Sequence, residues 1–368
     1  MSFLCQVSFS FIPRQIYGGY RMWWIYPVYV VDLIAMVALS FLLGNLVDML
    51  DKKTKISGAF IGGVMLAAVT SLPELFTAIS SIFLVNKPEY VVGDILGSII
   101  FDLVCLLLET FIFVKNFKDA KLGRFHIVNG TACLMMYGFA AYAFFAPQSA
   151  QLMLGDINAM SILIFILYIL TLIFQPKESE PEEEGEGKEV DWSLKKIVIL
   201  FIVSSLTLIG TSIALTYLTK GIQEQIPALS GSVAGALLLG IGTSIPEIVS
   251  TAQLFKKKNY DAGFGNMIGS CTFDFAIFAV SDFLTWHQYN NHTDADGNYI
   301  ISQRGIFIID ADSRQFEIFG IVVCALIIML CLFKCFTKFF NKKKAICYSI
   351  TGAFALASLA MYLIIFII

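Results

Sequence analysis

Hydrophobic residues fall in long blocks along the chain rather than in the short alternations typical of soluble domains. Each block is close to the roughly 20 apolar residues that a helix needs to cross about 30 Å of hydrocarbon. The blocks are residues 25–50, 57–85, 91–114, 126–146, 154–174, 194–218, 231–255, 262–286, 318–336 and 346–368. They lack the period of two that barrel strands require. The pattern therefore predicts an all-α membrane protein with ten transmembrane helices.

Two short motifs occur twice, in the same order. AAVTSLPELFTAIS in the second block corresponds to LGIGTSIPEIVSTA in the seventh, and YVVGDILGSIIFDL in the third corresponds to AGFGNMIGSCTFDF in the eighth. Glu74 precedes Asp102 by 28 positions, and Glu247 precedes Asp274 by 27. Five helices separate equivalent positions, so the second copy enters the membrane from the opposite side. This organisation predicts two five-helix inverted-topology repeats, as secondary transporters have.

An acidic run, KESEPEEEGEGKEVD, separates the two predicted repeats and carries most of the acidic excess behind the net charge of −3. We interpret residues 175–192 as a solvated linker without a specific role. The repeats are then residues 1–174, with its motifs at 66–103, and residues 193–368, with its motifs at 239–275.

Basic residues gather in alternate connections between the blocks. They are Lys52, Lys53, Lys55, Lys115, Lys118, Lys121, Arg124, Lys195, Lys196, Lys256, Lys257, Lys258, Lys338, Lys342, Lys343 and Lys344. By the positive-inside rule these connections face the cytoplasm. We therefore predict a multi-pass protein of the cell membrane with a cytoplasmic linker and both termini outside.

Four carboxylates lie well inside the apolar blocks, at symmetric places in the two copies: Glu74, Asp102, Glu247 and Asp274. A charged side chain at the bilayer centre costs about 3 kcal/mol on insertion scales. The sequence places no Lys or Arg at comparable depth to neutralise these residues. They require cations or protons, which favours an ion site over interhelical packing alone.

Each of the two glutamates follows a proline and a pair of hydroxyl residues. Pro73 and Pro246 lack the N–H that would bond a carbonyl one turn earlier, so each frees a carbonyl oxygen inside an apolar block. The neighbouring hydroxyl residues are Thr70, Ser71, Thr243 and Ser244. Carboxylate, carbonyl and hydroxyl oxygens are the ligands that Ca²⁺ and Na⁺ prefer.

The second motif carries a polar face at helical steps of four. Its residues are Asp94, Ser98 and Asp102 in the first copy and Asn266, Ser270 and Asp274 in the second. Beside it runs a stripe of small residues, Gly93, Gly97, Gly265 and Gly269, which would allow close helix approach. We expect the polar face to line the site and the glycines to pack.

At these residues the sequence resembles the cation/calcium exchanger superfamily, and most closely the sodium/calcium exchanger family, whose two repeats carry GTS-x-PE and GN-x-x-GS motifs. The resemblance implies that Glu74 and Glu247 are the central Ca²⁺ carboxylates. It also implies overlapping Ca²⁺ and Na⁺ sites completed by Thr70, Ser71, Thr243, Ser244, Ser98, Ser270, Asp102, Asp274 and the carbonyls of Ala67 and Gly240. Asp94 and Asn266 are secondary candidates. Exchange would proceed by alternating access, with the first and sixth helices sliding across a four-helix core.

Three positions depart from the usual family pattern. Val69 replaces a glycine, Asp94 replaces an asparagine, and Asp102 stands where many relatives carry asparagine. The additional acids could bind a further cation, hold a proton or change ion choice. The preferred interpretation is an antiporter that exports cytosolic Ca²⁺ in exchange for Na⁺. A Ca²⁺/H⁺ exchanger, a K⁺-dependent exchanger or an exchanger of another divalent cation stays open.

Other functional classes fit the sequence less well. It shows no nucleotide-binding motif, no nucleophile and base pair, and no zinc-ligand spacing among its 8 cysteines and 3 histidines. We therefore expect neither an enzyme nor an ATP-driven pump, and no cofactor, nucleotide or nucleic acid. A passive channel is disfavoured by the two antiparallel copies. The expected partners are Ca²⁺, monovalent cations and the lipid bilayer, with a monomer as the working assumption.

Three further acids lie in or near the apolar blocks. Asp32 and Glu109 have no counterpart in the other copy, and we expect them to be structural or peripheral polar residues. Asp282 lies near the outer end of the eighth block, and we expect it to be solvated.

Overall fold

The computed structural model describes residues 23–53, 66–113, 124–146, 150–154, 157–174, 192–226, 229–290 and 306–307. This part of the chain is helical apart from a hairpin of two short strands, β1 (Met153–Leu154) and β2 (Ile157–Asn158). The ninth and tenth predicted helices and nearly all of the predicted linker lie outside the described residues. The count of ten helices therefore stays a prediction.

The described helices coincide with the predicted apolar blocks between residues 25 and 286. They are α1 (Ile25–Lys53), α3 (Ala67–Thr70), α4 (Leu72–Phe83), α5 (Glu89–Ile112), α7 (Arg124–Phe145), α8 (Ala159–Ile173), α9 (Leu194–Gln225), α10 (Gly231–Ala234), the π-helical turn η3 (Gly235–Gly240), α11 (Ile241–Thr243), α12 (Ile245–Lys256) and α13 (Tyr260–Asn290). Among the described residues, 6 helical spans are long and apolar enough to cross a membrane, and Ala67–Phe83 and Ala159–Ile173 are shorter apolar spans. The chain is thus a multi-pass membrane protein.

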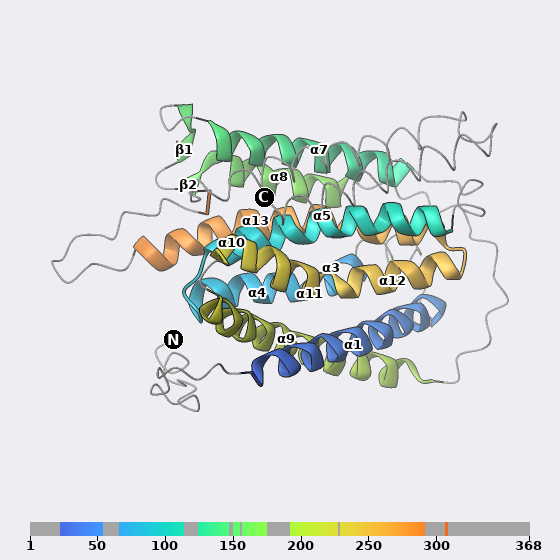
Figure 1. Ribbon diagram of the computed structural model, residues 1–368. Helices are drawn as coiled ribbons and strands as arrows, with labels where there is room; N and C mark the ends of the chain where they lie inside the picture. The colour runs from blue at the N-terminus through green and yellow to red at the C-terminus, as the bar shows by residue number, and fades with distance from the viewer. Residues whose placement is uncertain are drawn as a thin grey trace.

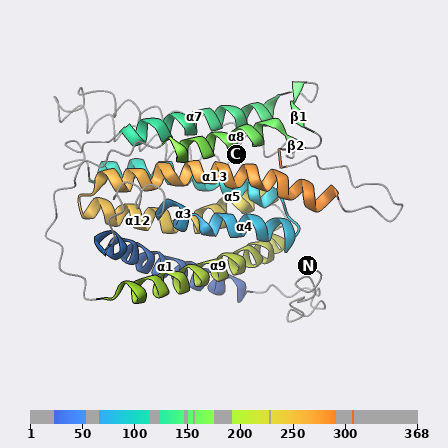
Figure 2. The same cartoon turned by 180° about the vertical axis from the view of Figure 1, so that it is seen from behind.

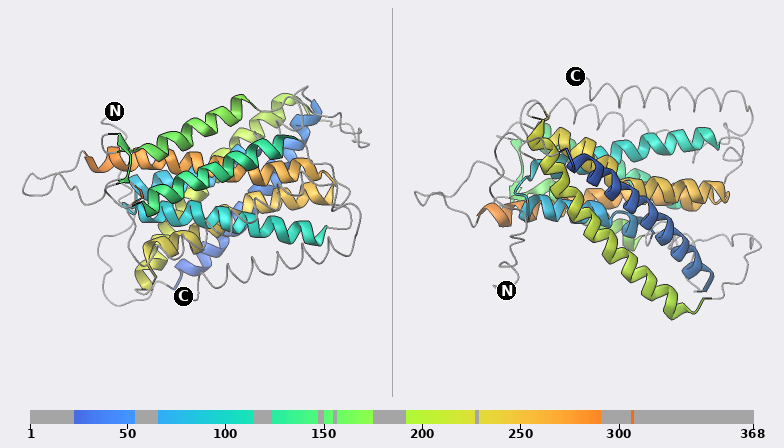
Figure 3. Two further views of the ribbon diagram at one scale, coloured as in Figure 1. Left: turned by 90° about the horizontal axis from the view of Figure 1, so that it is seen from above. Right: turned by 60° about the horizontal axis from the view of Figure 1, so that its bottom comes forward.

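The helices form three layers (Figures 1 and 2). Helices α7 and α8 lie on one side, the motif-bearing helices α4, α5, α12 and α13 form the centre, and α1 and α9 cover the other side. Figure 3 shows α1 and α9 running side by side and obliquely across the central layer. Many of their outward side chains are large, apolar and exposed, including Val31, Ile34 and Leu206. This is the composition expected of a surface that faces lipid.

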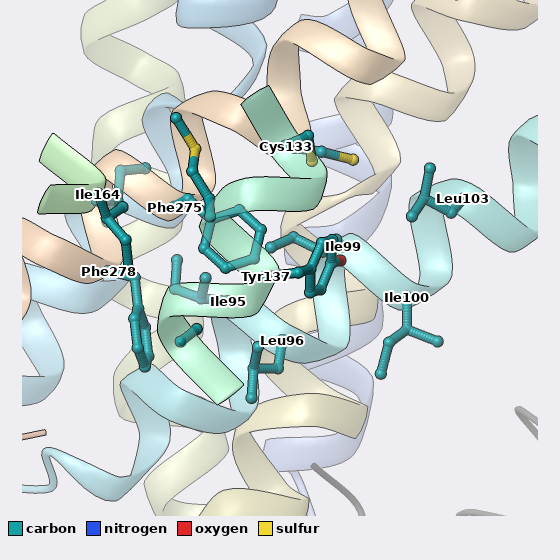
Figure 4. Packing of buried hydrophobic residues seen from close by; sticks show 14 of the residues in the cluster. Ile95, Leu96, Ile99, Ile100, Leu103, Cys133, Tyr137, Ile164, Phe275 and Phe278 are labelled. Atoms are coloured by element: carbon teal, nitrogen blue, oxygen red, sulfur yellow. The ribbon is translucent and has the colours of Figure 1, made fainter. Parts of the chain in front are cut away.

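The largest apolar core joins the central layer to α7 and α8 (Figure 4). Ile99 and Leu103 of α5 are fully buried there, as is Phe275 of α13. The ring of Tyr137 on α7 meets Phe275 edge to face, with ring centroids 4.6 Å apart. This packing fixes α5 and α13 against a scaffold and leaves their opposite faces to the polar residues.

The two copies of the Pro-Glu motif adopt the same broken-helix structure. The helix interrupts at Ser71 between α3 and α4 and at Ser244 between α11 and α12, and Pro73 or Pro246 lies in the first turn of the following helix. Proline can begin a helix but cannot continue one without losing a hydrogen bond. The positions of the two prolines in the sequence therefore determine where both helices break. Helices α4 and α12 run in opposite directions, as do α5 and α13 (Figure 1). These directions are those expected of an inverted repeat.

Helix α5 packs directly on the backbone of the α10 and η3 segment. A Cβ atom on Gly93 would lie 1.9 Å from the carbonyl oxygen of Ser232, and one on Gly97 would lie 2.7 Å from Cα of Ala236. The predicted packing role of these two glycines is confirmed. The close approach matters because it brings the polar face of α5 into contact with the second copy of the Pro-Glu motif.

The two ends of the bundle differ in character. The exposed lysines at the start of α9, Lys195 and Lys196, and at the end of α12, Lys256 to Lys258, lie at the same end (Figure 1). At the opposite end, hydrogen bonds tie α1 and α9 to the central layer. The Tyr29 hydroxyl donates to Leu238 O at 2.7 Å, Lys220 Nζ donates to Val85 O at 3.3 Å, and the Tyr90 hydroxyl donates to the Gln223 carboxamide.

The expectation that Asp282 is solvated is wrong. Its side chain is buried, and Oδ2 accepts hydrogen bonds from Ser161 Oγ at 2.7 Å and from the Asn158 amide at 3.3 Å. Oδ1 accepts from the Ile306 amide at 3.0 Å. The β1–β2 hairpin and the segment at Ile306 fold back over α13, which continues beyond its predicted end, and Asp282 fastens both to the helix.

Replacing Gly93 by alanine should destabilise the protein, because the new methyl group would meet backbone that cannot rotate away. We expect a loss of ~1–3 kcal/mol, the usual cost of overpacking, measured by thermal unfolding in detergent. Gly138 is the matched control, since a Cβ there meets nothing within 4 Å. Gly138→Ala should be neutral or slightly stabilising, and an equal loss in both variants would contradict the packing role.

Candidate cation-binding site

All four predicted carboxylates are buried in the central layer. Glu74 and Glu247 lie in the first turns of α4 and α12, while Asp102 and Asp274 lie midway along α5 and α13. Each is 1% exposed or less. The broken helices place the two glutamates at helix N-termini, where unpaired N–H groups and the helix dipole favour negative charge.

Hydroxyl groups of the two motifs meet at Glu247. Ser71 Oγ, from the first motif, donates to Glu247 Oε1 at 3.0 Å, and Ser270 Oγ donates to the same oxygen at 3.3 Å. The two serine oxygens are 2.7 Å apart. Although 176 positions separate Ser71 and Glu247 in the sequence, the fold makes them direct neighbours. The two copies of the motif therefore contribute to one shared set of oxygens.

A second polar contact joins α5 to η3 and α11. Ser98 Oγ lies 3.2 Å from Thr243 Oγ1 and donates to Gly240 O at 3.2 Å. Thr243 Oγ1 also lies 3.2 Å from Asp94 Oδ1 and can donate to it. Asp94 is completely buried. The structure thus gives this secondary candidate a hydroxyl partner from the second copy of the Pro-Glu motif.

The carbonyls proposed as ligands are engaged in hydrogen bonds. Ala67 O accepts from the Ser71 amide at 3.0 Å and from Thr70 Oγ1 at 3.2 Å. Gly240 O accepts from the Ser244 amide at 3.2 Å as well as from Ser98. Since a hydroxyl can rotate, an arriving cation would compete with the Thr70 and Ser98 hydroxyls for these oxygens rather than with the backbone.

Several carboxylate oxygens accept no hydrogen bond of normal geometry in the part of the chain that the structure describes. They are Oε2 of Glu74, Oε2 of Glu247, and both oxygens of Asp102 and of Asp274. Glu74 shares the buried central layer with four other acidic side chains, those of Glu247, Asp274, Asp94 and Asp102. Buried ionised groups are costly unless paired, so this assembly is stable only with cations or protons among its oxygens.

The carboxylates do not form a single acidic cage. Across the described ranges, no group of three or more His, Cys, Asp or Glu side chains converges closely enough to hold one metal ion. The oxygens instead extend along the central layer from Ser98 to Ser270. Such a distribution suits several adjacent cation positions, each built from one or two carboxylates with hydroxyl and carbonyl oxygens.

Sequence reasoning missed the hydroxyls that hold the two secondary candidates. The Thr77 hydroxyl donates to Asp94 Oδ2. In the other copy, Asn266 Nδ2 donates to Ser250 Oγ and to Thr251 Oγ1, both at 3.0 Å. Thr77 and Ser250 each follow the motif glutamate by three positions. An alignment of the two copies would therefore have shown a hydroxyl residue at the same position in each. The bond direction reverses between the copies: Asp94 accepts, whereas Asn266 donates.

Removing the Thr77 hydroxyl should weaken the hold on Asp94. We expect Thr77→Val to lower the free energy of unfolding by roughly 1–2 kcal/mol, because a buried carboxylate loses a donor. Thr171→Val is the matched control, since Thr171 Oγ1 donates only within its own helix, to Tyr168 O at 2.6 Å. In thermal unfolding, Thr77→Ser should have nearly the same stability as the parent protein, because it keeps the hydroxyl. An equal loss of unfolding free energy in Thr77→Val and Thr171→Val would contradict the hydrogen bond to Asp94.

Comparison with known proteins places this arrangement in context. The chain matches the family model described as sodium/calcium exchanger protein over residues 24–176 and 196–368. It is 23% identical over 292 residues to the vacuolar calcium ion transporter of Schizosaccharomyces pombe, a match that covers 73% of this chain and 68% of that protein.

Solved structures share the fold. A structure of the sodium-calcium exchanger NCX_Mj, soaked with Na⁺ and Sr²⁺, gives a TM-score of 0.55 at 19% identity and covers 91% of this chain and 97% of that one. The H⁺/Ca²⁺ exchanger CAX gives a TM-score of 0.56 at 14% identity, with coverages of 93% and 90%. At these identities the likeness establishes the fold alone. The two proteins are named for different counter-ions, so the fold does not select between Na⁺ and H⁺.

Proposed function

The chain belongs to the sodium/calcium exchanger protein family, which confirms the resemblance of its motifs, and from this premise we propose that it is a secondary antiporter exchanging Ca²⁺ for Na⁺. In its normal direction it would export Ca²⁺ from the cytosol. No cofactor is required, because the driving force is the gradient of the counter-ion.

The observation that carries the proposal is the buried, uncompensated set of carboxylates. The ion pairs seen within the described ranges, Lys87 with Glu89 and His126 with Asp261, lie at helix ends and reach none of the four carboxylates. Hydroxyl groups from both halves of the chain meet at Glu247, and the Ser98 hydroxyl meets Gly240 O and Thr243 in the same layer. Hard oxygen ligands with excess negative charge bind Ca²⁺ and Na⁺ and give no reason to bind an anion or an apolar solute.

Shared oxygens explain why transport would be an exchange. Ser71 and Ser270 both donate to Glu247, so a Ca²⁺ ion and a Na⁺ ion that use these groups compete for them. Without ions, the carboxylates repel one another in a medium that cannot stabilise their charge, which disfavours movement of the empty protein. Only the loaded site can therefore change its exposure.

We further propose that α1 and α9 are the elements that move. They cross the central layer obliquely and expose apolar surface to lipid (Figure 3). A slide of the pair would break the hydrogen bonds from Tyr29 to Leu238 and from Lys220 to Val85 and form others. The central layer, locked by glycine contacts and by the core beneath it, would stay fixed.

Exchange of Ca²⁺ for H⁺ is the second candidate. It is favoured by Asp102, whose two oxygens accept no hydrogen bond of normal geometry from the described residues, so a proton has a place to bind. The hydroxyls at every Thr-Ser position favour Na⁺, since protonation requires carboxylates alone. A K⁺-dependent exchanger or one for another divalent cation follows from the same oxygen chemistry.

The proposal includes the complete topology: ten helices in two five-helix repeats, residues 1–174 and 193–368, of opposite orientation in the cell membrane. The opposite directions of α4 and α12 support it (Figure 1). The lysines gathered at one end of the bundle support a cytoplasmic linker at residues 175–192 and termini outside. The transport unit proposed is a monomer, since both motifs come from one chain.

A gradient of the counter-ion should drive Ca²⁺ uptake into proteoliposomes that contain the purified protein. Vesicles loaded with Na⁺ and diluted into Na⁺-free buffer should accumulate ⁴⁵Ca²⁺. Na⁺ that leaves the vesicle vacates the shared oxygens on the outside, and external Ca²⁺ can then bind there and be carried in. Vesicles loaded with K⁺, or given only a pH gradient, should not. Uptake driven by the pH gradient alone would select the H⁺ exchanger, and Ca²⁺ flux without any counter-ion would contradict exchange itself.

Neutralising either motif glutamate should abolish transport. We expect Glu74→Gln and Glu247→Gln to reduce Ca²⁺ uptake by about 100-fold or more, because each removes a charge that the ion requires in a low-dielectric interior. Glu89→Gln is the control of equal charge change, since Glu89 pairs with Lys87 near the surface. Uptake and membrane insertion are measured together, and normal transport by Glu74→Gln would refute the assigned site.

A further inference from the structure

One buried carboxylate lies outside the site described above. Glu109, in the last turns of α5, is only 6% exposed. Neither Oε1 nor Oε2 accepts a hydrogen bond in the described part of the chain. A structural role, as expected from sequence, would give this side chain donors in the way that Asp282 has them. Its acceptors are instead available to a ligand that carries positive charge.

The register between α5 and α12 shows what lies beside Glu109. Ser98 bonds Gly240, and the ring of Phe113 meets that of Phe255 with centroids 6.0 Å apart. Gly240 ends η3 and Phe255 lies in α12, and in each pair the residue numbers differ by 142, so α5 runs parallel to the segment from η3 to α12 without a shift. Glu109 is therefore level with Thr251, a buried residue whose hydroxyl accepts from Asn266 at 3.0 Å. The polar groups of the site thus extend along α12 to the level of Glu109.

Asp102 and Glu109 follow each other along one face of α5. They are seven residues apart, which is about two helical turns and roughly 10 Å along the axis. The two side-chain oxygens of each residue accept no hydrogen bond of normal geometry from the described residues. Asp102 and Glu109 are therefore two consecutive acids along one face of α5, neither of which has a hydrogen-bond donor of normal geometry among the described residues.

Glu109 also has a defined place relative to the ends of the bundle. One turn beyond it on the same face is Phe113, which packs on Phe255, and α12 ends directly afterwards at the exposed Lys256. The residue therefore lies between the lysine-bearing end of the protein and Asp102. A cation that enters from this end and reaches Asp102 along α5 passes Glu109 first.

We propose that Glu109 is an additional cation-binding residue, a relay that takes up Ca²⁺ or the counter-ion between the lysine-bearing end and Asp102. Its unpaired carboxylate offsets part of the dehydration of the entering ion before the full ligand set is available. The inference rests on the proposed cation exchange and adds a binding position on one side of the site only. This one-sidedness distinguishes the relay from a general contribution to the site.

The test compares Ca²⁺ transport from each side in right-side-out and inside-out membrane vesicles. Glu109→Gln should raise KM for Ca²⁺ presented at the lysine-bearing end by about fivefold or more, with KM from the opposite side unchanged. Glu109→Asp should restore most of the parent value, since it keeps the charge. Glu89→Gln, with the same charge change near the opposite end of α5, should alter neither value.

Two results would overturn the relay. One is a KM that is unchanged, or raised equally from both sides, in the folded Glu109→Gln protein. The other is a fall in melting temperature with normal KM in the fraction that folds, which would show that Glu109 serves stability. These outcomes are separate from failure of the proposed function, which would appear as absence of Ca²⁺ flux in the parent protein under every gradient.

Discussion

Buried carboxylate oxygens that accept no hydrogen bond of normal geometry from the described residues are the constraint on which the rest of this structure depends. Ionised acids in such a place are tolerable only beside positive charge, and the described interior supplies none as Lys or Arg. The fold reduces the problem with local devices: Pro73 and Pro246 restart each broken helix just before a glutamate, so that the positive end of a helix dipole faces each carboxylate. These devices lower the cost of the charges without neutralising them. The remaining deficit is what a transported cation supplies.

Close helix contact brings the two halves of the proposed site together. Gly93 and Gly97 let α5 approach the backbone at Ser232 and Ala236 to distances that any side chain would prevent. At this separation the Ser98 hydroxyl reaches Gly240 O. Ser71, at the break between α3 and α4, likewise reaches Glu247 of α12. Oxygens from opposite halves of the chain are thereby brought within hydrogen-bond distance of one another. The proposed competition between cations rests on this packing, because the two halves contribute oxygens to one shared set.

The sequence predicted the features that depend on local chemistry and on internal repetition. Helix breaks at the two Pro-Glu motifs, burial of Glu74 and Glu247, and the packing role of Gly93 all follow from residue type and spacing. The sequence could not predict which side chains of the two halves contact each other. The register of α5 on η3 depends on a π-helical turn, and no sequence pattern predicts such a turn. It also misplaced Asp282, since the donors that bury this residue come from the distant hairpin and from Ile306. From sequence alone, a carboxylate near a predicted helix end is expected to be solvated. Only the tertiary structure shows that other segments of the chain cover it.

The structure distinguishes the two additional acids of the first copy, Asp94 and Asp102, which the sequence treats alike. Asp94 receives hydroxyl donors from Thr77 and Thr243 on two different helices, so its side chain links the two copies. Asn266 occupies the corresponding place in the second copy and donates to its hydroxyl partners instead. Asp102, by contrast, has two oxygens without donors of normal geometry in the described chain. Of the two departures from the family pattern, Asp94 therefore has hydroxyl donors, whereas Asp102 is the residue on which the proposed choice between Na⁺ and H⁺ rests.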